Sequence, residues 1–283
     1  MKCLIIYYSL TNATAQIAEN ISTGLERAGF HVRLCNIKDE SLPDLQEFDL
    51  LGIGTPVYYV QIPINVLECI ETLSNEKNIK AFAFLTNSSF AWNAGDMLKK
   101  EIFRRGFSIS GWFYSNGTGY FLPYIKQGCL VSPGHPTSED LERAQQFGYD
   151  MGTGSGESRW MEKTTLPPMI YRLEQNLTKR VMIRRIYQKL FYLDKRKCIK
   201  CGICVNGCPT QNIIRDIEGC PSWNKSCIMC LSCEFHCPKE AILSPVSWAI
   251  MKPLIRYNVK KIMDDPGLEK IKARHHDGKI DTL

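Results

Sequence analysis

The chain has 283 residues, of which 44% are hydrophobic and 23% are charged, and its formal net charge is +6. This composition excludes a disordered or fibrous protein, and the length is enough for about two domains. No apolar run approaches the roughly 18 residues of a membrane span and the first residues do not form a secretory signal, so we expect a cytoplasmic protein.

Cysteine and charge divide the chain into two parts. Nine of the 13 cysteines lie between residues 198 and 237. Residues 1–151 carry 12 Lys and Arg against 16 Asp and Glu, whereas the remainder carries 23 against 13. In a cytoplasmic chain of this size, clustered cysteines indicate metal or redox chemistry rather than disulfides. We expect four segments: an N-terminal domain over 1–151, a linker and basic amphipathic helix over 152–194, a cysteine-rich domain over 195–245 and a basic tail over 246–283.

Strand and helix patterns alternate along the N-terminal part. Runs rich in β-branched and aromatic residues predict strands over 2–9, 31–37, 48–54, 80–86 and 107–115. Helical patterns follow these strands, over 14–29, 63–73, 93–106 and 138–152. The alternation predicts an α/β fold, a doubly wound parallel five-stranded sheet with right-handed crossovers.

Three loops at the carboxyl ends of the predicted strands form a candidate ligand site, because such sheets bind ligands at that edge. The first loop offers hydroxyls and helix N–H groups to an anion, and the other two offer aromatic rings to a flat ligand. The alternative is that the first loop only caps a surface helix and that the rings are packing residues. The candidate residues are Ser9, Thr11, Asn12, Ala13, Thr14, Thr55, Pro56, Val57, Tyr58, Tyr59, Asn87, Trp92, Asn93, Ala94 and Gly95.

These loops resemble those of the flavodoxin family, whose first loop usually runs Ser/Thr-x-Thr-Gly-Asn-Thr after a Tyr or Phe. The stretch from Tyr8 to Thr14 keeps the three hydroxyls but has Asn12 where glycine is usual and Ala13 where asparagine is usual. Asn tolerates left-handed backbone angles better than most residues, which favours the same loop geometry. The resemblance covers residues 1 to about 151 and implies the strand order 2-1-3-4-5 with FMN at the site.

A basic connector follows the flexible sequence GTGSGES at 152–158. Between Lys163 and Lys200, 11 Lys and Arg stand against two acidic residues. The connector predicts an amphipathic helix with a cationic face. We interpret this face as a docking site for an acidic partner protein. A solvated face, packing on the acidic N-terminal part and an anionic membrane surface are the alternatives, and no nucleic acid is expected. Its apolar residues are Leu173, Leu177, Val181, Ile183, Ile186 and Leu190.

The cysteine-rich part contains an internal duplication. The stretches CIKCGICVNGCP at 198–209 and CIMCLSCEFHCP at 227–238 superpose with an offset of 29 residues. Each reads C-x2-C-x2-C-x3-C-P, the spacing of bacterial two-cluster ferredoxins, in which the last cysteine ligates the other cluster. Zinc is the alternative metal. A zinc site would not explain the third cysteine of the C-x2-C-x2-C run or the Cys-Pro that follows it in both copies. The spacing predicts one [4Fe–4S] cluster at Cys198, Cys201, Cys204 and Cys237, and a second at Cys208, Cys227, Cys230 and Cys233.

Five residues within or after the cysteine-rich part have no predicted ligand role. Cys220 is expected to be a free structural thiol, Trp223 to pack over one cluster, and His236 to lie at the surface or behind the ligands. The basic tail is expected to pack on the connector, with His275 and His276 at the surface.

The whole chain resembles the ferredoxin–flavodoxin fusion proteins, which are found largely in anaerobes. This resemblance implies an electron-transfer iron–sulfur flavoprotein that passes electrons between two [4Fe–4S] clusters and FMN, and to or from a partner redox protein. No acid–base catalytic residue is predicted. Two alternatives remain open. One is an FMN-dependent reductase of a quinone or another conjugated acceptor, bound near Tyr58, Trp92 and Tyr120; the other is a structural or regulatory iron–sulfur protein without flavin.

Overall fold

The computed structural model describes residues 1–155 and 166–282, and these residues form two compact units. The first unit contains Met1–Thr118 and Gly134–Gln175, and the second contains residues 119–133 together with the chain from Asn176 onward. The boundaries of these two units differ from those of the four predicted segments. The four segments were predicted from composition and stay predictions. The predicted flexible linker lies partly outside the described residues.

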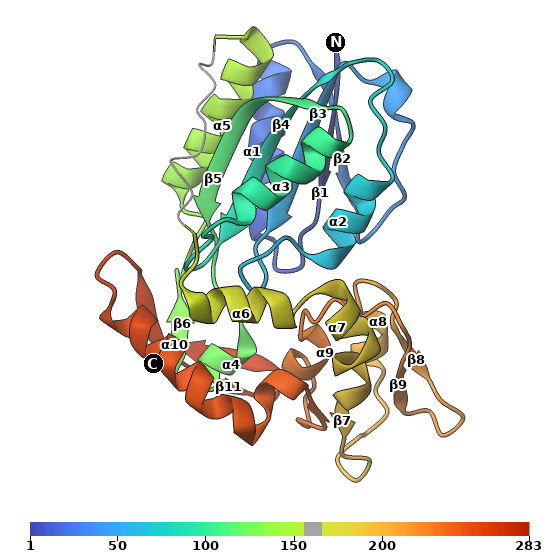
Figure 1. Cartoon of the computed structure of the whole chain (residues 1–283), viewed down its shortest axis with the longest axis vertical. Coiled ribbons are helices and arrows are strands. Elements are labelled where there is room, and N and C mark those ends of the chain that lie inside the picture. Colours follow the sequence, from blue (N-terminus) through green and yellow to red (C-terminus); the bar gives the residue numbers. More distant parts are fainter. Residues whose placement is uncertain (156–165, 283) are drawn as a thin grey trace. The chain divides into compact units, whose positions relative to one another are not determined.

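The first unit is built on a five-stranded parallel sheet. Its elements are β1 (Lys2–Tyr7), α1 (Ala13–Arg27), β2 (His31–Asn36), the short helix η1 (Leu45–Glu47), β3 (Leu50–Pro56), α2 (Ile64–Glu71), β4 (Lys80–Asn87), α3 (Ala94–Arg104), β5 (Ser108–Asn116), α5 (Ser138–Thr153) and α6 (Met169–Leu177). The strand order is β2-β1-β3-β4-β5. Helices α1 and α5 cover one face and α2 and α3 the other (Figure 1), so the inner strands are apolar almost throughout. The predicted five strands, four helices and strand order are confirmed.

Helices α1 and α5 approach each other closely at two glycines. A Cβ atom on Gly24 would lie 1.9 Å from the carbonyl oxygen of Gln145, and one on Gly148 would lie 2.1 Å from the carbonyl oxygen of Ile21. Both contacts are with backbone, which cannot move aside as a flexible side chain can. Glycine therefore sets the distance between these two helices.

Replacing Gly24 by alanine is expected to lower the free energy of unfolding by about 2–3 kcal/mol, because overpacking outweighs the gain of about 1 kcal/mol in helix propensity. The measurement is denaturant unfolding followed by circular dichroism. Thr23→Ala, at the neighbouring exposed position of α1, is the control. An unchanged unfolding midpoint for Gly24→Ala would contradict the close approach.

The second unit combines two distant parts of the chain. Its elements are α4 (Leu122–Ile125), β6 (Cys129–Val131), α7 (Arg180–Arg185), η2 (Tyr187–Leu190), β7 (Tyr192–Leu193), α8 (Ile203–Asn206), β8 (Ile213–Arg215), β9 (Pro221–Trp223), α9 (Ser232–Phe235), β10 (Ile242–Leu243), η3 (Pro245–Ser247), η4 (Ala249–Met251), α10 (Lys252–Asp264), β11 (Lys270–His276) and β12 (Lys279–Thr282). Strand β6 pairs antiparallel with β11, which forms a hairpin with β12.

Residues 119–133, here called the excursion, lie in sequence between the two parts of the first unit but belong to the second unit. Ile125 and Leu130 of the excursion form a small core with Ala273 of β11. Tyr120, expected beside the flavin in the reductase alternative, belongs to the excursion, and its ring packs edge-on against Phe235 at a centroid distance of 6.3 Å.

The prediction of one continuous connector helix is wrong. Helix α6 ends at Leu177, Lys179 is extended (φ −63°, ψ 152°), and α7 begins at Arg180. Asn176 and Thr178, which both have low helix propensity, lie at this break. Of the six apolar residues on the predicted face only Ile183 is buried, and the exposed ones are Leu173, Leu177, Val181, Ile186 and Leu190.

The prediction that His275 lies at the surface is also wrong. Its side chain is buried, and its Nε2 donates to the carbonyl oxygen of Phe235 at 2.8 Å. The alternation of β11 places His276 on the opposite, exposed side, as predicted. Within the described ranges, no helix combines the length and the apolar character that a membrane crossing requires.

Candidate functional site

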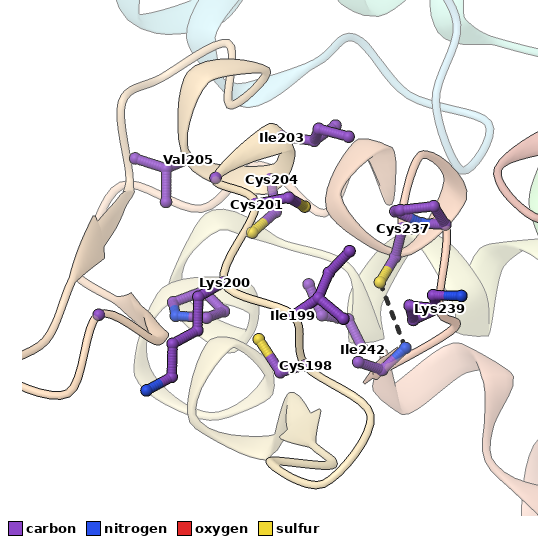
Figure 2. A pocket seen from close by; sticks show the side chains of 15 residues that line it. Cys198, Ile199, Lys200, Cys201, Ile203, Cys204, Val205, Cys237, Lys239 and Ile242 are labelled. Carbon is purple, nitrogen blue, oxygen red and sulfur yellow. Dashed lines mark hydrogen bonds between the residues drawn. The ribbon is translucent and has the colours of Figure 1, made fainter.

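The eight cysteines of the two motifs line two separate pockets of the second unit. One set, Cys198, Cys201, Cys204 and Cys237, lines the first pocket, where Figure 2 shows the four sulfur atoms around one space. The other set, Cys208, Cys227, Cys230 and Cys233, lines the second pocket. Each repeat thus contributes its last cysteine to the pocket of the other repeat, as the ferredoxin spacing predicts. This grouping supports the ligand assignment, which stays a prediction.

The backbone conformation of the two repeats recurs at the sequence offset. The short helices α8 and α9 begin after Gly202 and Leu231, which are equivalent and have positive φ angles of 81° and 62°. Two further equivalent pairs share positive φ, Lys200 with Met229 and Gln211 with Glu240. A positive φ outside glycine costs about 1–3 kcal/mol and persists only where the surroundings require it. The same unfavourable backbone angles therefore recur in both repeats, which indicates that the positions of the cysteines depend on these turns.

Backbone N–H groups point at the sulfur of the last cysteine in each repeat. The amide nitrogen of Asn212 lies 3.2 Å from Cys208 Sγ, and that of Ala241 lies 3.2 Å from Cys237 Sγ. The second bond is the dashed line in Figure 2. Hydrogen bonds to thiolate sulfur are among the features that set the reduction potential of a bound cluster. Four cysteines, apolar walls and N–H donors to sulfur fit a 4Fe–4S cluster in each pocket.

The two pockets differ in their access to solvent. In the first, Cys201 is exposed, and Ile199 and Ile203 at its rim are 58% and 44% exposed. In the second, Cys227 and Cys233 are buried, and Cys208 and Cys230 are partly buried. The first pocket is therefore more accessible to solvent than the second.

The two other predictions near the repeats concern Trp223 and Cys220. Trp223 stacks on Phe191 with ring centroids 5.5 Å apart, and both rings line the second pocket. Cys220 is buried but lines neither described pocket, and its N–H donates to the Asp216 carboxylate at 2.8 Å. These positions agree with a packing role for Trp223 and a structural role for Cys220.

The three predicted loops of the first unit meet at the carboxyl ends of β1, β3 and β4. Thr14 Oγ1 lies 2.7 Å from Thr86 Oγ1, and the N–H of Val57 donates to the carbonyl oxygen of Thr86 at 3.0 Å. Tyr8 and Tyr58 pack edge-on with ring centroids 6.1 Å apart. The loops over 9–14, 55–59 and 87–95 thus lie at the switch point between β1 and β3, where doubly wound sheets bind ligands.

In the first loop, Asn12 adopts the left-handed conformation for which glycine is usual, with φ 71° and ψ −17°. Ser9 Oγ accepts the N–H of Ala15 at 3.2 Å, so this hydroxyl caps α1, and the Thr14 hydroxyl is engaged with Thr86. Of the three predicted hydroxyl residues only Thr11 is exposed. The loop therefore offers an anion the Thr11 hydroxyl and the positive end of α1.

In the third loop, two buried donors have no hydrogen-bond partner among the described residues: Asn87 Nδ2 and Trp92 Nε1. Buried donors are nearly always paired in proteins, so these two are available to acceptor atoms of a bound ligand or of an ordered water. The hydroxyl of Tyr114 donates to Asn87 Oδ1 and holds this side chain at the site. Tyr59, Val60 and Trp92 also have positive φ angles, of 51°, 61° and 43°. A flat ligand with acceptor atoms, such as the ring system of FMN, fits these observations.

Helix α6 contributes contacts to the same loops that the sequence did not indicate. The ring of Tyr171 lies 5.8 Å from that of Trp92, centroid to centroid, and Phe90 completes the aromatic cluster. Gln175 Nε2 donates to the carbonyl oxygen of Val60 and to Asn93 Oδ1, at 2.8 Å in both cases. The basic composition of the connector predicted a cationic face and gave no indication of these contacts. The signal that was present is the spacing of four residues between Tyr171 and Gln175, which places both on one helix face.

Glu174, also on α6, gives a prediction for the pH dependence of stability. Burial raises the pKa of its carboxyl from 4.5 to about 7. The folded chain therefore holds this proton more tightly than the unfolded chain, so stability is lost as pH rises between these two values. The loss should be about 2–3 kcal/mol, and Glu174→Gln should avoid it. The unfolding free energy of Glu174→Gln minus that of the wild type should grow from pH ~5 to ~7 and then level off. A pH-independent difference would contradict the burial of this carboxyl.

The comparisons with known proteins match two separate stretches of the chain. A family profile described as Flavodoxin matches residues 5–140, and one described as 4Fe-4S binding domain matches residues 191–214, which include the first cysteine motif only. The comparison with curated proteins gives no match. Among solved structures, a flavodoxin from the domain Archaea is 16% identical with a TM-score of 0.41, over 54% of this chain and 98% of that chain. Oxidised Flavodoxin 1 from Bacillus cereus is 18% identical with a TM-score of 0.42, over 56% and 100%.

Proposed function

We propose that this chain, in which a flavodoxin domain is joined to a 4Fe–4S ferredoxin-type domain, is an electron carrier that connects two 4Fe–4S clusters and FMN with a partner redox protein. The two domains support an electron-transfer iron–sulfur flavoprotein. The observation that carries the finer proposal is the exchange of the last cysteine between the two repeats, which gives each pocket four cysteines. When bound, the clusters exchange single electrons and FMN exchanges one or two.

The chain's own residues would bind these groups and control their surroundings. Each pocket would supply four thiolates, with the N–H of Ala241 donating to sulfur in the first pocket and the N–H groups of Asn212 and Met229 donating to sulfur in the second. Phe191 and Trp223 exclude water from the second pocket, and a drier site disfavours added negative charge. In the first unit, Thr11 and the start of α1 would hold the phosphate, and Asn87 Nδ2 and Trp92 Nε1 would donate to the ring.

We infer that the partner docks at the rim of the first pocket. Exposed Ile199 and Ile203 form an apolar centre there, and Lys200 and Lys239, also exposed, line the same pocket. Lys200 is also the last residue of the basic run that begins at Lys163. An acidic redox protein complements this surface, and the rate of its association should fall as ionic strength rises.

The proposed function is tested by the cofactor content of protein purified without oxygen. We expect about eight irons, eight sulfides and one FMN per chain, as two tetra-iron clusters and one flavin require. About four irons would mean that only one pocket is loaded and would contradict the two-cluster proposal. Iron without flavin, even after reconstitution with FMN, would favour the structural or regulatory alternative instead.

A further inference from the structure

We propose that helix α6 is the outer wall of the flavin site, with Tyr171 and Gln175 as positioning residues for the two loops that hold the ring. This inference rests on the proposed function, because FMN is the ligand concerned. It extends the flavin-binding part of the chain beyond residue 140, where the flavodoxin match ends, to Gln175, where the first unit ends.

The contacts of Gln175 tie together two loops that come from different strands. One amide group donates to the carbonyl oxygen of Val60, in the loop after β3, and to Asn93 Oδ1, in the loop after β4. Both distances are 2.8 Å, which is normal for a good hydrogen bond. A single side chain therefore fixes the spacing between the two loops that carry Tyr58 and Trp92, the predicted flanks of the ring.

The residues that Gln175 holds are those with unusual backbone angles. Val60 itself has φ 61°, and Trp92, next to Asn93, has φ 43°. A β-branched or aromatic residue in this region is strained and keeps the conformation only where other contacts enforce it. Gln175 supplies two of these contacts, and the tilted ring contact between Tyr171 and Trp92 supplies another.

Helix α6 presents one face to these loops and the other to solvent. Tyr171 is 4% exposed, whereas Met169 and Leu173 are 81% and 57% exposed. Figure 1 shows α6 running across the carboxyl ends of the strands. Residues at spacings of four share a helix face, so Tyr171 and Gln175 point the same way, and Leu173 does not. Leu173 is thus a matched control on the same helix.

The test compares Gln175→Ala and Tyr171→Ala with Leu173→Ala in the full-length chain. The first readout is the dissociation constant of FMN, from the quenching of FMN fluorescence by protein stripped of flavin. We expect Gln175→Ala and Tyr171→Ala each to weaken FMN binding about tenfold, because hydrogen bonds and aromatic contacts that order the site are lost. Leu173→Ala should bind FMN as tightly as the wild type does.

The second readout is hydrogen exchange of the backbone amides over 57–62 and 88–94 in the flavin-free chain. Gln175→Ala should exchange faster than the wild type in both loops, and Leu173→Ala should not. Unchanged FMN affinity and unchanged exchange in Gln175→Ala would overturn the proposal. Faster exchange with unchanged affinity would overturn it too, because α6 would then order the loops without serving the ligand. A wild-type chain that binds no FMN would overturn the proposed flavin function and, with it, the role of α6 as a wall of the flavin site. The hydrogen-exchange comparison would then show only whether α6 orders the two loops.

Discussion

The chain in which Cys198 and Cys237 are both replaced by alanine is expected to lose about four irons, the same number that either single replacement removes. Both cysteines line the first pocket, so the second replacement acts on a site that is already empty. Replacing Cys198 and Cys208 together should remove about eight irons, because these two line different pockets. The measurements are iron and acid-labile sulfide per chain after anaerobic purification.

This comparison separates two assignments that have the same ligands in total. If each repeat held its own cluster, Cys198 and Cys208 would belong to one site, and their double replacement would remove only about four irons. That result would contradict the exchanged pockets. Cys220→Ala is the control. Cys220 lines neither of the two pockets, so this variant should keep all its iron. FMN content serves as the measure that the first unit remains folded in each variant.

Replacing Lys126 by methionine is expected to destabilise the second unit by about 2–4 kcal/mol, because it leaves a buried carboxylate without its counter-charge. Lys126 Nζ lies 2.7 Å from Glu234 Oε1, and the Glu234 side chain is 1% exposed. The remaining oxygen of Glu234 accepts the N–H of Ser244 at 2.9 Å. Since Glu234 follows Cys233 directly, this ion pair also links the excursion to the second cysteine pocket. The measurement is the urea concentration at which the visible absorbance of the clusters is lost.

Two variants identify the cause of this loss. Adding Glu234→Gln to Lys126→Met removes the uncompensated charge and should restore a large part of the stability. Lys195→Met breaks an ion pair with Glu218 whose two side chains are 60% and 56% exposed, and it should change stability by less than about 1 kcal/mol. A Lys126→Met chain as stable as Lys195→Met would show that the excursion is not held by this contact.

The sheet and the cysteine pockets could be predicted from the sequence because both leave local patterns. Buried parallel strands read as apolar runs, and helices between them keep their period, so the elements of the first unit are visible one by one. The cysteine spacing is the same in both motifs. In two-cluster ferredoxins the last cysteine of each motif ligates the cluster of the other motif, and this rule predicts which distant cysteines share a pocket. Asn12 could be assigned to the left-handed turn because its side chain tolerates that conformation.

The excursion and the role of helix α6 could not be predicted, because both depend on contacts between distant residues. Strand β6 has three residues and finds its partner, β11, only near the end of the chain. The Asp277–Gly278 turn of the β11–β12 hairpin was a readable signal, but no local pattern names β6 as the third strand. The positive charge of the connector favours a solvated or docking face, and no local pattern pairs Tyr171 and Gln175 with the distant loops after β3 and β4.

The central claim, that one chain connects the cysteine pockets with the flavin site, is tested most directly by the kinetics of reduction. The fully loaded protein is mixed rapidly with a limiting amount of a one-electron donor, and cluster and flavin absorbance are followed at several protein concentrations. Transfer within the chain predicts that flavin reduction follows cluster reduction at a rate that does not depend on protein concentration. A rate that rises in proportion to protein concentration, or a flavin that stays oxidised while the clusters are reduced, would contradict the account.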